Sequence, residues 1–308
     1  MKNILVTGAN GFVGQHLVKE LATHGMVVTA VGGRAGFSQP SRYVSNYVTL
    51  DLSDRAAADT INFKDINGVI HLAGLAAVGP SFDDPMLYIN TNIGIEVNLF
   101  EAALSQNCFP RFLTISSGSL YDAGATLPIT EDTAVLSSSP YAVSKLGQEQ
   151  MARYYEGRGF ESLIARPFNH CGPGQGAGFI VPDLAEQLMA VEKGSQHTVL
   201  VGNLDAERDY TDVRDIVRAY RLLLEKGNTG ETYNICSGTP RSGHTVLQGL
   251  QAASNIKVTI KRDEARMRPA DNPIIYGTHK KISDHTGWQP KIAFETTMAD
   301  VVADWRTR

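Results

Sequence analysis

The chain is poor in the residue patterns that bind metals or form disulfides. Its three cysteines, Cys108, Cys171 and Cys236, are far apart, and no CxxC pair occurs. The eight histidines form neither an HxxxH nor an HExxH pattern. An odd number of isolated cysteines argues against a disulfide framework and against a zinc site. We therefore expect no metal and a reduced cellular environment.

Long apolar runs and runs of like charge are also missing. No stretch approaches the roughly 18 uninterrupted apolar residues of a membrane span, and few apolar residues precede Gly8, fewer than a signal peptide needs. The 28 basic and 32 acidic side chains give a net charge of −4. These features disfavour nucleic-acid and membrane partners and predict a soluble, cytoplasmic protein.

Glycine is abundant, with 29 residues in 308. Around these glycines the sequence indicates an alternation of strands and helices. The first helix is indicated by Val13, Leu17 and Leu21, which recur at helical spacing. Expected strands are short apolar runs at 4–6, 27–31, 47–50, 69–72, 111–115 and 162–165, and longer helices are expected at 85–104 and 141–155. This alternation predicts an α/β fold with a doubly wound parallel (Rossmann) sheet.

The pattern changes at Arg166-Pro167, where a loop dense in Gly and Pro follows. We therefore predict two domains, a dinucleotide-binding domain at 1–166 and a smaller, mixed α/β substrate domain at 167–308. The segment of about 209–236 is a candidate for returning to the first domain.

Three glycines follow the first strand and open a helix. A GxxGxxG pattern there allows a sharp turn and lets a pyrophosphate approach the backbone at a helix N-terminus. A tight strand–helix turn without a ligand is the simpler alternative. The candidate cofactor-binding residues of this motif are Gly8, Asn10, Gly11, Phe12, Val13 and Gly14.

The end of the second strand should set the choice of cofactor. It lacks the acid that would bind a ribose 2′-hydroxyl and is followed by Arg34, whose guanidinium can grip a 2′-phosphate. We therefore expect NADP(H) to be preferred, with NAD(H) possible; otherwise Arg34 is a solvated loop residue. Further cofactor contacts are expected from Asp51 and Leu52 near the adenine, and from Leu72, Ala73 and Gly74 after the fourth strand.

A tyrosine and a lysine four residues apart, Tyr141 and Lys145, share one helix face. A nearby ammonium favours the phenolate, so such a pair can move a proton to or from a carbonyl or alcohol oxygen. Ser117 and Ser119 follow another predicted strand, where ligand sites of doubly wound sheets lie. Either serine could instead be a turn residue.

In this order, the glycine motif, Ser117 and Tyr141xxxLys145 resemble the extended short-chain dehydrogenase/reductase family over essentially the whole chain. The resemblance implies a catalytic triad of Ser117, Tyr141 and Lys145, with Tyr141 and Lys145 also at the cofactor. It includes Asn92, which we place at the cofactor too. It further implies a homodimer built on two helices per subunit.

The segment around Asn169 and His170 is similar to the GDP-mannose branch of that family. Asn169 would contact the diphosphate of a sugar nucleotide, Arg208 would contact the nucleotide ribose and phosphates, and Arg268 is a second candidate for holding the phosphates. Ordinary loop hydrogen bonds and surface ion pairs are the alternatives. The candidate substrate residues are Ser117, Ser119, Asn169, His170, Val181, Asn203, Arg208 and Arg268.

Dehydratases of that branch carry a glutamate two residues after the catalytic serine, where this chain has Ser119. A serine cannot do the proton work of a carboxylate near neutral pH. We therefore expect NAD(P)H-dependent reduction of the 4-keto group of a nucleotide-linked 6-deoxy sugar, with GDP-4-keto-6-deoxy-D-mannose giving GDP-D-rhamnose. A sugar-nucleotide 4-epimerase, a GDP-mannose 4,6-dehydratase and a dinucleotide-sensing regulatory protein remain alternatives.

Overall fold

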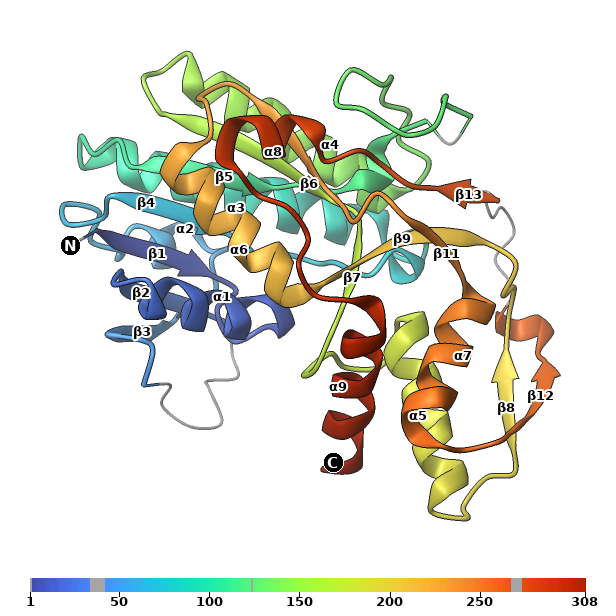
Figure 1. The fold of residues 1–308 in the computed structure, drawn as a ribbon. Helices are drawn as coiled ribbons and strands as arrows, with labels where there is room; N and C mark the ends of the chain where they lie inside the picture. Colours follow the sequence, from blue (N-terminus) through green and yellow to red (C-terminus); the bar gives the residue numbers. More distant parts are fainter. Residues whose placement is uncertain (1, 34–41, 123, 267–272) are drawn as a thin grey trace.

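The computed structural model describes residues 2–33, 42–122, 124–266 and 273–308, and its largest feature is a seven-stranded sheet (Figure 1). All neighbouring strands run parallel. In spatial order the strands are β10 (Thr232–Ile235), β6 (Ser162–Pro167), β5 (Arg111–Ile115), β4 (Gly68–His71), β1 (Asn3–Thr7), β2 (Val27–Gly32) and β3 (Asn46–Thr49). The predicted doubly wound parallel sheet is confirmed.

Helices cover both faces of the sheet because successive strand residues point to opposite sides. Ile4 and Val6 of β1 pack in the cluster that holds α1, α6 and α8, whereas Leu5 packs in the cluster that holds α2, α3 and α4. These helices are α1 (Phe12–Thr23), α2 (Arg55–Ala58), α3 (Pro85–Ser105), α4 (Pro140–Glu156), α6 (Val213–Lys226) and α8 (Lys280–Thr286).

A smaller half with mixed sheets lies beside the large sheet, as expected from the sequence (Figure 1). Its helices α5 (Ile180–Glu192), α7 (Gly243–Ser254) and α9 (Phe294–Arg306) share one apolar core. Its strands are β7 (Asn169–Cys171), β8 (Thr198–Val201), β9 (Glu207–Asp212), β11 (Pro240–Ser242), β12 (Thr259–Arg262) and β13 (Ile274–Ile275). Strand β9 pairs with β7, β11 and β13, and β8 pairs with β12.

The chain crosses between the two halves more than once. After β9 it enters α6, and β10 then pairs with β6 in the large sheet. Helix α6 and strand β10 thus lie with the large sheet, whereas β9 pairs in the smaller half. The domain bounds, including a return of the segment of about 209–236, stay predictions.

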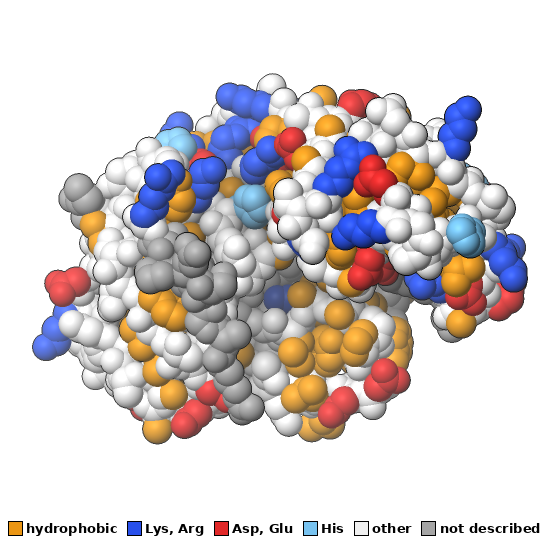
Figure 2. Space-filling view, turned by 90° about the horizontal axis from the view of Figure 1, so that it is seen from below, with side chains coloured by type: hydrophobic (Ala, Val, Ile, Leu, Met, Phe, Trp, Pro, Cys, Tyr) orange, Lys and Arg blue, Asp and Glu red, His pale blue; other side chains and the backbone are white. Residues whose placement is uncertain are grey.

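The surface mixes charges of both signs. On the face seen in Figure 2, basic and acidic side chains are interspersed over both sides of the view. None of the described helices is long and apolar enough to cross a membrane.

Candidate functional site

The glycine motif forms a tight backbone turn between β1 and α1. Gly8 has φ +65°, and a Cβ there would lie 2.8 Å from Ala73 N. A Cβ on Gly14 would lie 2.3 Å from Gly8 O, so only glycine allows the helix to start this close to the strand. Within the described residues, Gly11 caps α1 without a side-chain hydrogen bond. The first N–H groups of α1 are thus left for an anion, which fits the pyrophosphate of a dinucleotide.

The loop after β4 is fastened to β1 and to α3. Thr7 Oγ1 accepts hydrogen bonds from Leu72 N (3.2 Å) and Ala73 N (3.1 Å). Gly74 has φ +147°, and a Cβ there would lie 2.6 Å from Asn92 Oδ1. The backbone of this loop therefore runs next to the glycine motif, as the cofactor prediction requires.

Asn92 is fully buried and contacts protein groups on every side. Its Oδ1 accepts from Leu75 N (2.8 Å), and its Nδ2 donates to Leu75 O (3.2 Å) and to Ser144 Oγ (2.9 Å). These bonds tie the β4 loop to α4. Asn92 thus connects the loop after β4 to α4, and it would affect a cofactor through the position of that loop.

At the end of β2, a side chain on Gly32 would collide with two polar groups. A Cβ there would lie 2.2 Å from the Tyr47 hydroxyl and 2.7 Å from Asn10 Oδ1. Arg34, on which the NADP(H) prediction rests, is outside the described residues. Asp51 Oδ1 accepts from Ser53 N (3.1 Å) and Ser53 Oγ (2.6 Å), and Leu52 is buried.

The three predicted catalytic residues come together from two elements. Ser117 caps the 3₁₀ helix η2 (Gly118–Leu120) directly after β5, and Tyr141 and Lys145 lie in the first turns of α4. Helix α4 starts here because Ser139 Oγ accepts from Ala142 N (3.1 Å) and Pro140 occupies the first turn. Lys145 Nζ donates to Ile115 O at 3.0 Å, which brings the lysine to the end of β5 beside Ser117.

Burial governs the protonation of this group. It raises the pKa of Tyr141 above its ordinary value, and a hydrogen bond with Ser117 acts in the opposite direction. Burial lowers the pKa of Lys145 to about 8, and the carboxylates of Glu96 and Glu149 oppose that shift. Tyr141 therefore carries its proton at neutral pH and can donate it, while Lys145 is close to losing its own.

Ser119 is exposed and lies next to Ser117. The two hydroxyl oxygens are 2.9 Å apart, and Ser119 N donates to Ser117 Oγ at 3.1 Å. Both side chains are polar but neutral at ordinary pH. The position two residues after Ser117 thus offers hydrogen bonds and no carboxylate.

The predicted substrate residues are divided between the two halves. Asn169 pairs with Tyr210 across β7 and β9, and Arg208 lies on β9 opposite Arg241 of β11. Arg208 donates to Glu207 O at 2.7 Å, and Asn203 Oδ1 accepts from Asp205 N at 2.9 Å in the loop before β9. Arg268 is outside the described residues.

His170 links the predicted substrate loop to the glycine motif. Its ring stacks on that of Phe12, with centroids 6.3 Å apart and planes 9° apart. His16 Nε2 also lies 2.8 Å from Pro173 O, so α1 and the loop after β7 are held together twice. Val181 is buried in the apolar core shared by α5, α7 and α9, and its role at the substrate stays a prediction.

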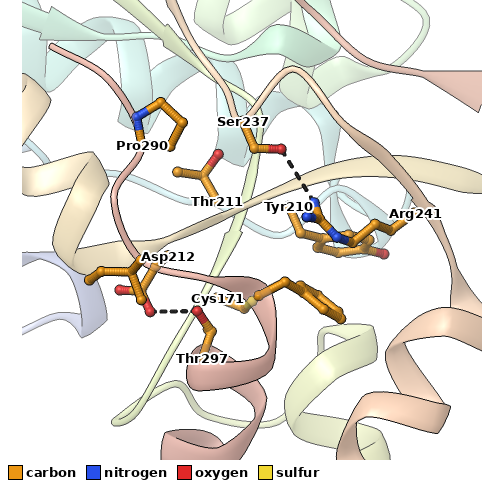
Figure 3. Close-up of a pocket in the computed structure, with 10 residues that line it drawn as sticks. Cys171, Tyr210, Thr211, Asp212, Ser237, Arg241, Pro290 and Thr297 are labelled. Carbon is orange, nitrogen blue, oxygen red and sulfur yellow. Dashed lines mark hydrogen bonds between the residues drawn. The ribbon is translucent and has the colours of Figure 1, made fainter.

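A small pocket lies against the end of β9, and none of the predicted catalytic residues lines it (Figure 3). Its volume of about 30 Å³ is close to the room that one water molecule occupies, too little for a sugar nucleotide. Asp212 accepts from Thr297 Oγ1 (2.7 Å) there and also caps α6. The pocket therefore lies where the N-terminus of α6 contacts α9. It is lined by Cys171, Tyr210, Thr211, Asp212, Ser237, Arg241, Pro290, Ile292, Phe294 and Thr297.

Sequence reasoning missed two buried ionisable groups next to Lys145, which are His71 of β4 and Glu96 of α3. Glu96 falls on the apolar face of its helix, one turn before Leu99 and Phe100. A carboxylate at such a position is the signal that could have identified it.

Known proteins match this chain over nearly its full length. A family model described as GDP-mannose 4,6 dehydratase matches residues 5–301. GDP-6-deoxy-D-mannose reductase of Pseudomonas aeruginosa is 35% identical, covering 100% of this chain and 98% of that protein. UDP-glucose 4-epimerase 2 of Arabidopsis thaliana is 27% identical, covering 97% and 94%.

Solved structures agree with these relatives. RMD from Pseudomonas aeruginosa complexed with NADPH has a TM-score of 0.88 at 32% identity and covers 100% of this chain and 99% of that one. UDP-glucose 4-epimerase from Bifidobacterium longum in complex with NAD+ and UDP also has a TM-score of 0.88, at 25% identity, covering 99% and 98%.

Proposed function

Because this chain belongs to the GDP-mannose 4,6-dehydratase family, a branch of the extended short-chain dehydrogenase/reductases that act on sugar nucleotides, we propose that it reduces a 4-keto sugar nucleotide. The proposed reaction converts GDP-4-keto-6-deoxy-D-mannose to GDP-D-rhamnose. The observation that carries it is the full-length similarity to a GDP-6-deoxy-D-mannose reductase, together with Ser119 in place of a carboxylate beside Ser117.

The protein's own groups would handle the proton and the developing charge. When bound, NADPH supplies a hydride to C4 of the sugar. Tyr141 donates its proton to the C4 oxygen as negative charge develops there, and Ser117 donates a hydrogen bond to the same oxygen. Lys145, charged and held at the end of β5, stabilises the phenolate that Tyr141 becomes.

The cofactor would lie along the backbone turns already described. The glycine motif and the N-terminus of α1 fit its pyrophosphate, and the loop Leu72–Gly74 borders it. NADP(H) is preferred in this proposal and NAD(H) remains possible, because RMD was solved with NADPH while epimerase relatives were solved with NAD+. Asn169, His170 and Arg208 would meet the substrate diphosphate from the smaller half.

A direct assay tests this function. The purified protein is mixed with NADPH and enzymatically prepared GDP-4-keto-6-deoxy-D-mannose, and cofactor oxidation is followed by absorbance. The product is then identified by NMR, and we expect GDP-D-rhamnose. Absence of NADPH oxidation with this substrate, in a sample shown to bind NADPH, would refute the proposal.

A 4-epimerase acting on a UDP sugar is the second candidate, favoured by the epimerase relatives that span the whole chain. It uses the same triad, so catalytic residues do not separate the two reactions. Thermal shifts with GDP, UDP and dTDP at equal concentrations distinguish the two candidates, because the ligand that binds more tightly raises the melting temperature more. We expect stabilisation by GDP; a preference for UDP would favour the epimerase.

We also propose that the protein is a homodimer joined through α3 and α4. The two helices run side by side, since a Cβ on Gly147 would lie 2.3 Å from the Ile93 side chain. Their outer faces expose Met86 (60%), Val143 (45%) and Tyr154 (54%). Apolar side chains gathered on one helical pair are typical of a surface that a second copy covers.

A further inference from the structure

A fully buried carboxyl group, Glu96 of α3, is hydrogen-bonded to β5 and to α4, the helix that carries Tyr141 and Lys145. Neither its side chain nor that of its neighbour His71 is exposed to solvent. Thr114 of β5 donates to Glu96 Oε1, and Gln148 Nε2 of α4 donates to Oε2 at 3.0 Å. A buried carboxyl whose two oxygens both accept hydrogen bonds is favoured as the ionised form by those bonds.

The hydrogen bonds of His71 reveal which nitrogen carries its proton. Thr7 Oγ1 already accepts from Leu72 N and Ala73 N, so its own hydrogen is left for His71 Nδ1, 2.7 Å away. Burial lowers the pKa of His71 to about 3, so the ring is neutral and its remaining proton is on Nε2. That nitrogen lies 3.3 Å from Glu96 Oε2, and among the described residues it has no hydrogen-bond partner, so its N–H contributes at most a weak electrostatic contact.

Glu96 is the carboxylate left to balance the charge of Lys145. Glu149, the other acid that acts on Lys145, forms a two-pronged ion pair with Arg166 at 2.7 and 2.6 Å. The hydrogen-bond donors to Glu96, in contrast, are neutral. Burial raises the pKa of Glu96 to about 7, and Lys145 opposes that shift, so each group favours the charged form of the other.

We propose that Glu96 is a positioning residue of the proposed active site, whose buried carboxylate keeps the Lys145 ammonium charged. The inference rests on the proposed function, because the charge on Lys145 matters through Tyr141. Around this pair the structure places His71 from β4, Glu149 from α4 with Arg166 from β6, and Tyr141 itself. His71 and Tyr141 are neutral near pH 7, and Glu149 is already paired.

The test measures the protonation of Lys145 directly, without substrate or cofactor. Lysine side chains are labelled with ¹³C, the Lys145 signal is assigned by its loss in Lys145→Arg, and its shift is followed against pH. In the parent protein we expect a midpoint near pH 8. In Glu96→Gln we expect the midpoint to fall by about one pH unit, because an attractive charge is lost while shape is kept.

Two further variants make the result specific. Thr114→Val removes one donor to the carboxylate and should move the midpoint in the same direction by less. Glu101→Gln makes the identical substitution on the same helix, at a side chain that accepts instead from the Tyr155 hydroxyl (2.7 Å), and should leave the midpoint unchanged. Thermal unfolding of each variant verifies that it is folded.

The pH dependence of turnover provides the second readout. If Lys145 must be charged, kcat of Glu96→Gln should be about fivefold below the parent at pH 8 and nearly equal at pH 6. An unchanged Lys145 midpoint in folded Glu96→Gln and Thr114→Val overturns the inference. A shifted midpoint in a protein that does not reduce the keto sugar leaves the role of Glu96 intact and refutes the proposed function instead.

Discussion

At the scale of single residues, the proposed chemistry depends on burial more than on the sequence spacing of Tyr141 and Lys145. The spacing places both on one helix face, but the lysine ammonium is directed to Ile115 O, and nearby acids oppose the fall in its pKa that burial causes. Burial meanwhile keeps the proton on Tyr141. The site thus pairs a protonated phenol with an ammonium group that burial makes easier to deprotonate.

Removing the phenol hydroxyl should abolish proton donation without disturbing the fold. We expect Tyr141→Phe to lower kcat by on the order of 100-fold or more, since the ring is kept and only the acid is lost. The dissociation constant for NADPH, measured by fluorescence titration, should stay within about twofold of the parent value. Unchanged turnover would disprove the assigned role.

The lowered pKa of Lys145 also predicts an effect on the free energy of unfolding. Its pKa falls from 10.5 in the unfolded chain to about 8 in the folded protein, so the buried charge destabilises the fold below pH 8. That cost disappears as the pH rises from 8 to 10.5. Lys145→Met should therefore raise the free energy of unfolding at pH 7. The net gain should be on the order of 1 to 2 kcal/mol once the loss of the hydrogen bond to Ile115 O is subtracted.

Urea unfolding at several pH values measures this effect. The advantage of Lys145→Met should shrink as the pH approaches 10.5, while activity is lost at every pH. A variant less stable than the parent at pH 7 would show that the lysine stabilises the fold, contrary to this argument.

At the scale of elements, the turn from β1 into α1 is the part with least freedom. Backbone atoms of Gly8 and Ala9 occupy the space where a Cβ on Gly14 would lie. A longer side chain there pushes the helix away from the strand. The N–H groups proposed to hold the pyrophosphate would move with it.

Gly14→Ala should therefore weaken NADPH binding by about tenfold or more and lower the melting temperature by several degrees. Gly157→Ala is the matched control, because that glycine ends α4 with φ −62° and a Cβ would meet only Tyr154 O at 3.4 Å. Isothermal titration and thermal unfolding measure both variants. Equal NADPH affinity of Gly14→Ala and the parent would argue against pyrophosphate binding at this turn.

At the scale of the whole molecule, two halves are fastened at several points around the proposed site. His170 stacks on Phe12, His16 lies against Pro173 O, and Asp212 joins α6 to α9. The predicted cofactor turn and the predicted substrate loop are therefore held next to each other by the protein itself.

The proposed dimer is tested on the outer face of α4. Val143→Glu should convert a dimer into a monomer in light scattering, because a charge would be buried in the interface at a cost of several kcal/mol. Ile260→Glu is the matched control, since Ile260 of β12 is also 45% exposed but lies in the smaller half. Equal masses for Val143→Glu and the parent would place the interface elsewhere.

Much of the fold could be predicted from the sequence because the signals are local. Buried parallel strands appear as short β-branched runs, and the glycine motif, the helix spacing of Tyr141 and Lys145 and Ser119 are each visible within a few residues. The confirmed parallel sheet and the membership of the family follow from those patterns. Two candidates, Arg34 and Arg268, lie outside the described residues, and the roles of the others stay predictions.

Contacts between distant segments were decided only by the tertiary structure. The burial of Val181 in the core of the smaller half is one example, because one apolar residue at a helix start can face either way. His71, Glu96 and Lys145 lie far apart in sequence, yet β4, α3 and α4 bring them together. The sequence alone determined which chemical groups are available, and packing decided which of them carry charge, because burial and neighbouring charges act through space.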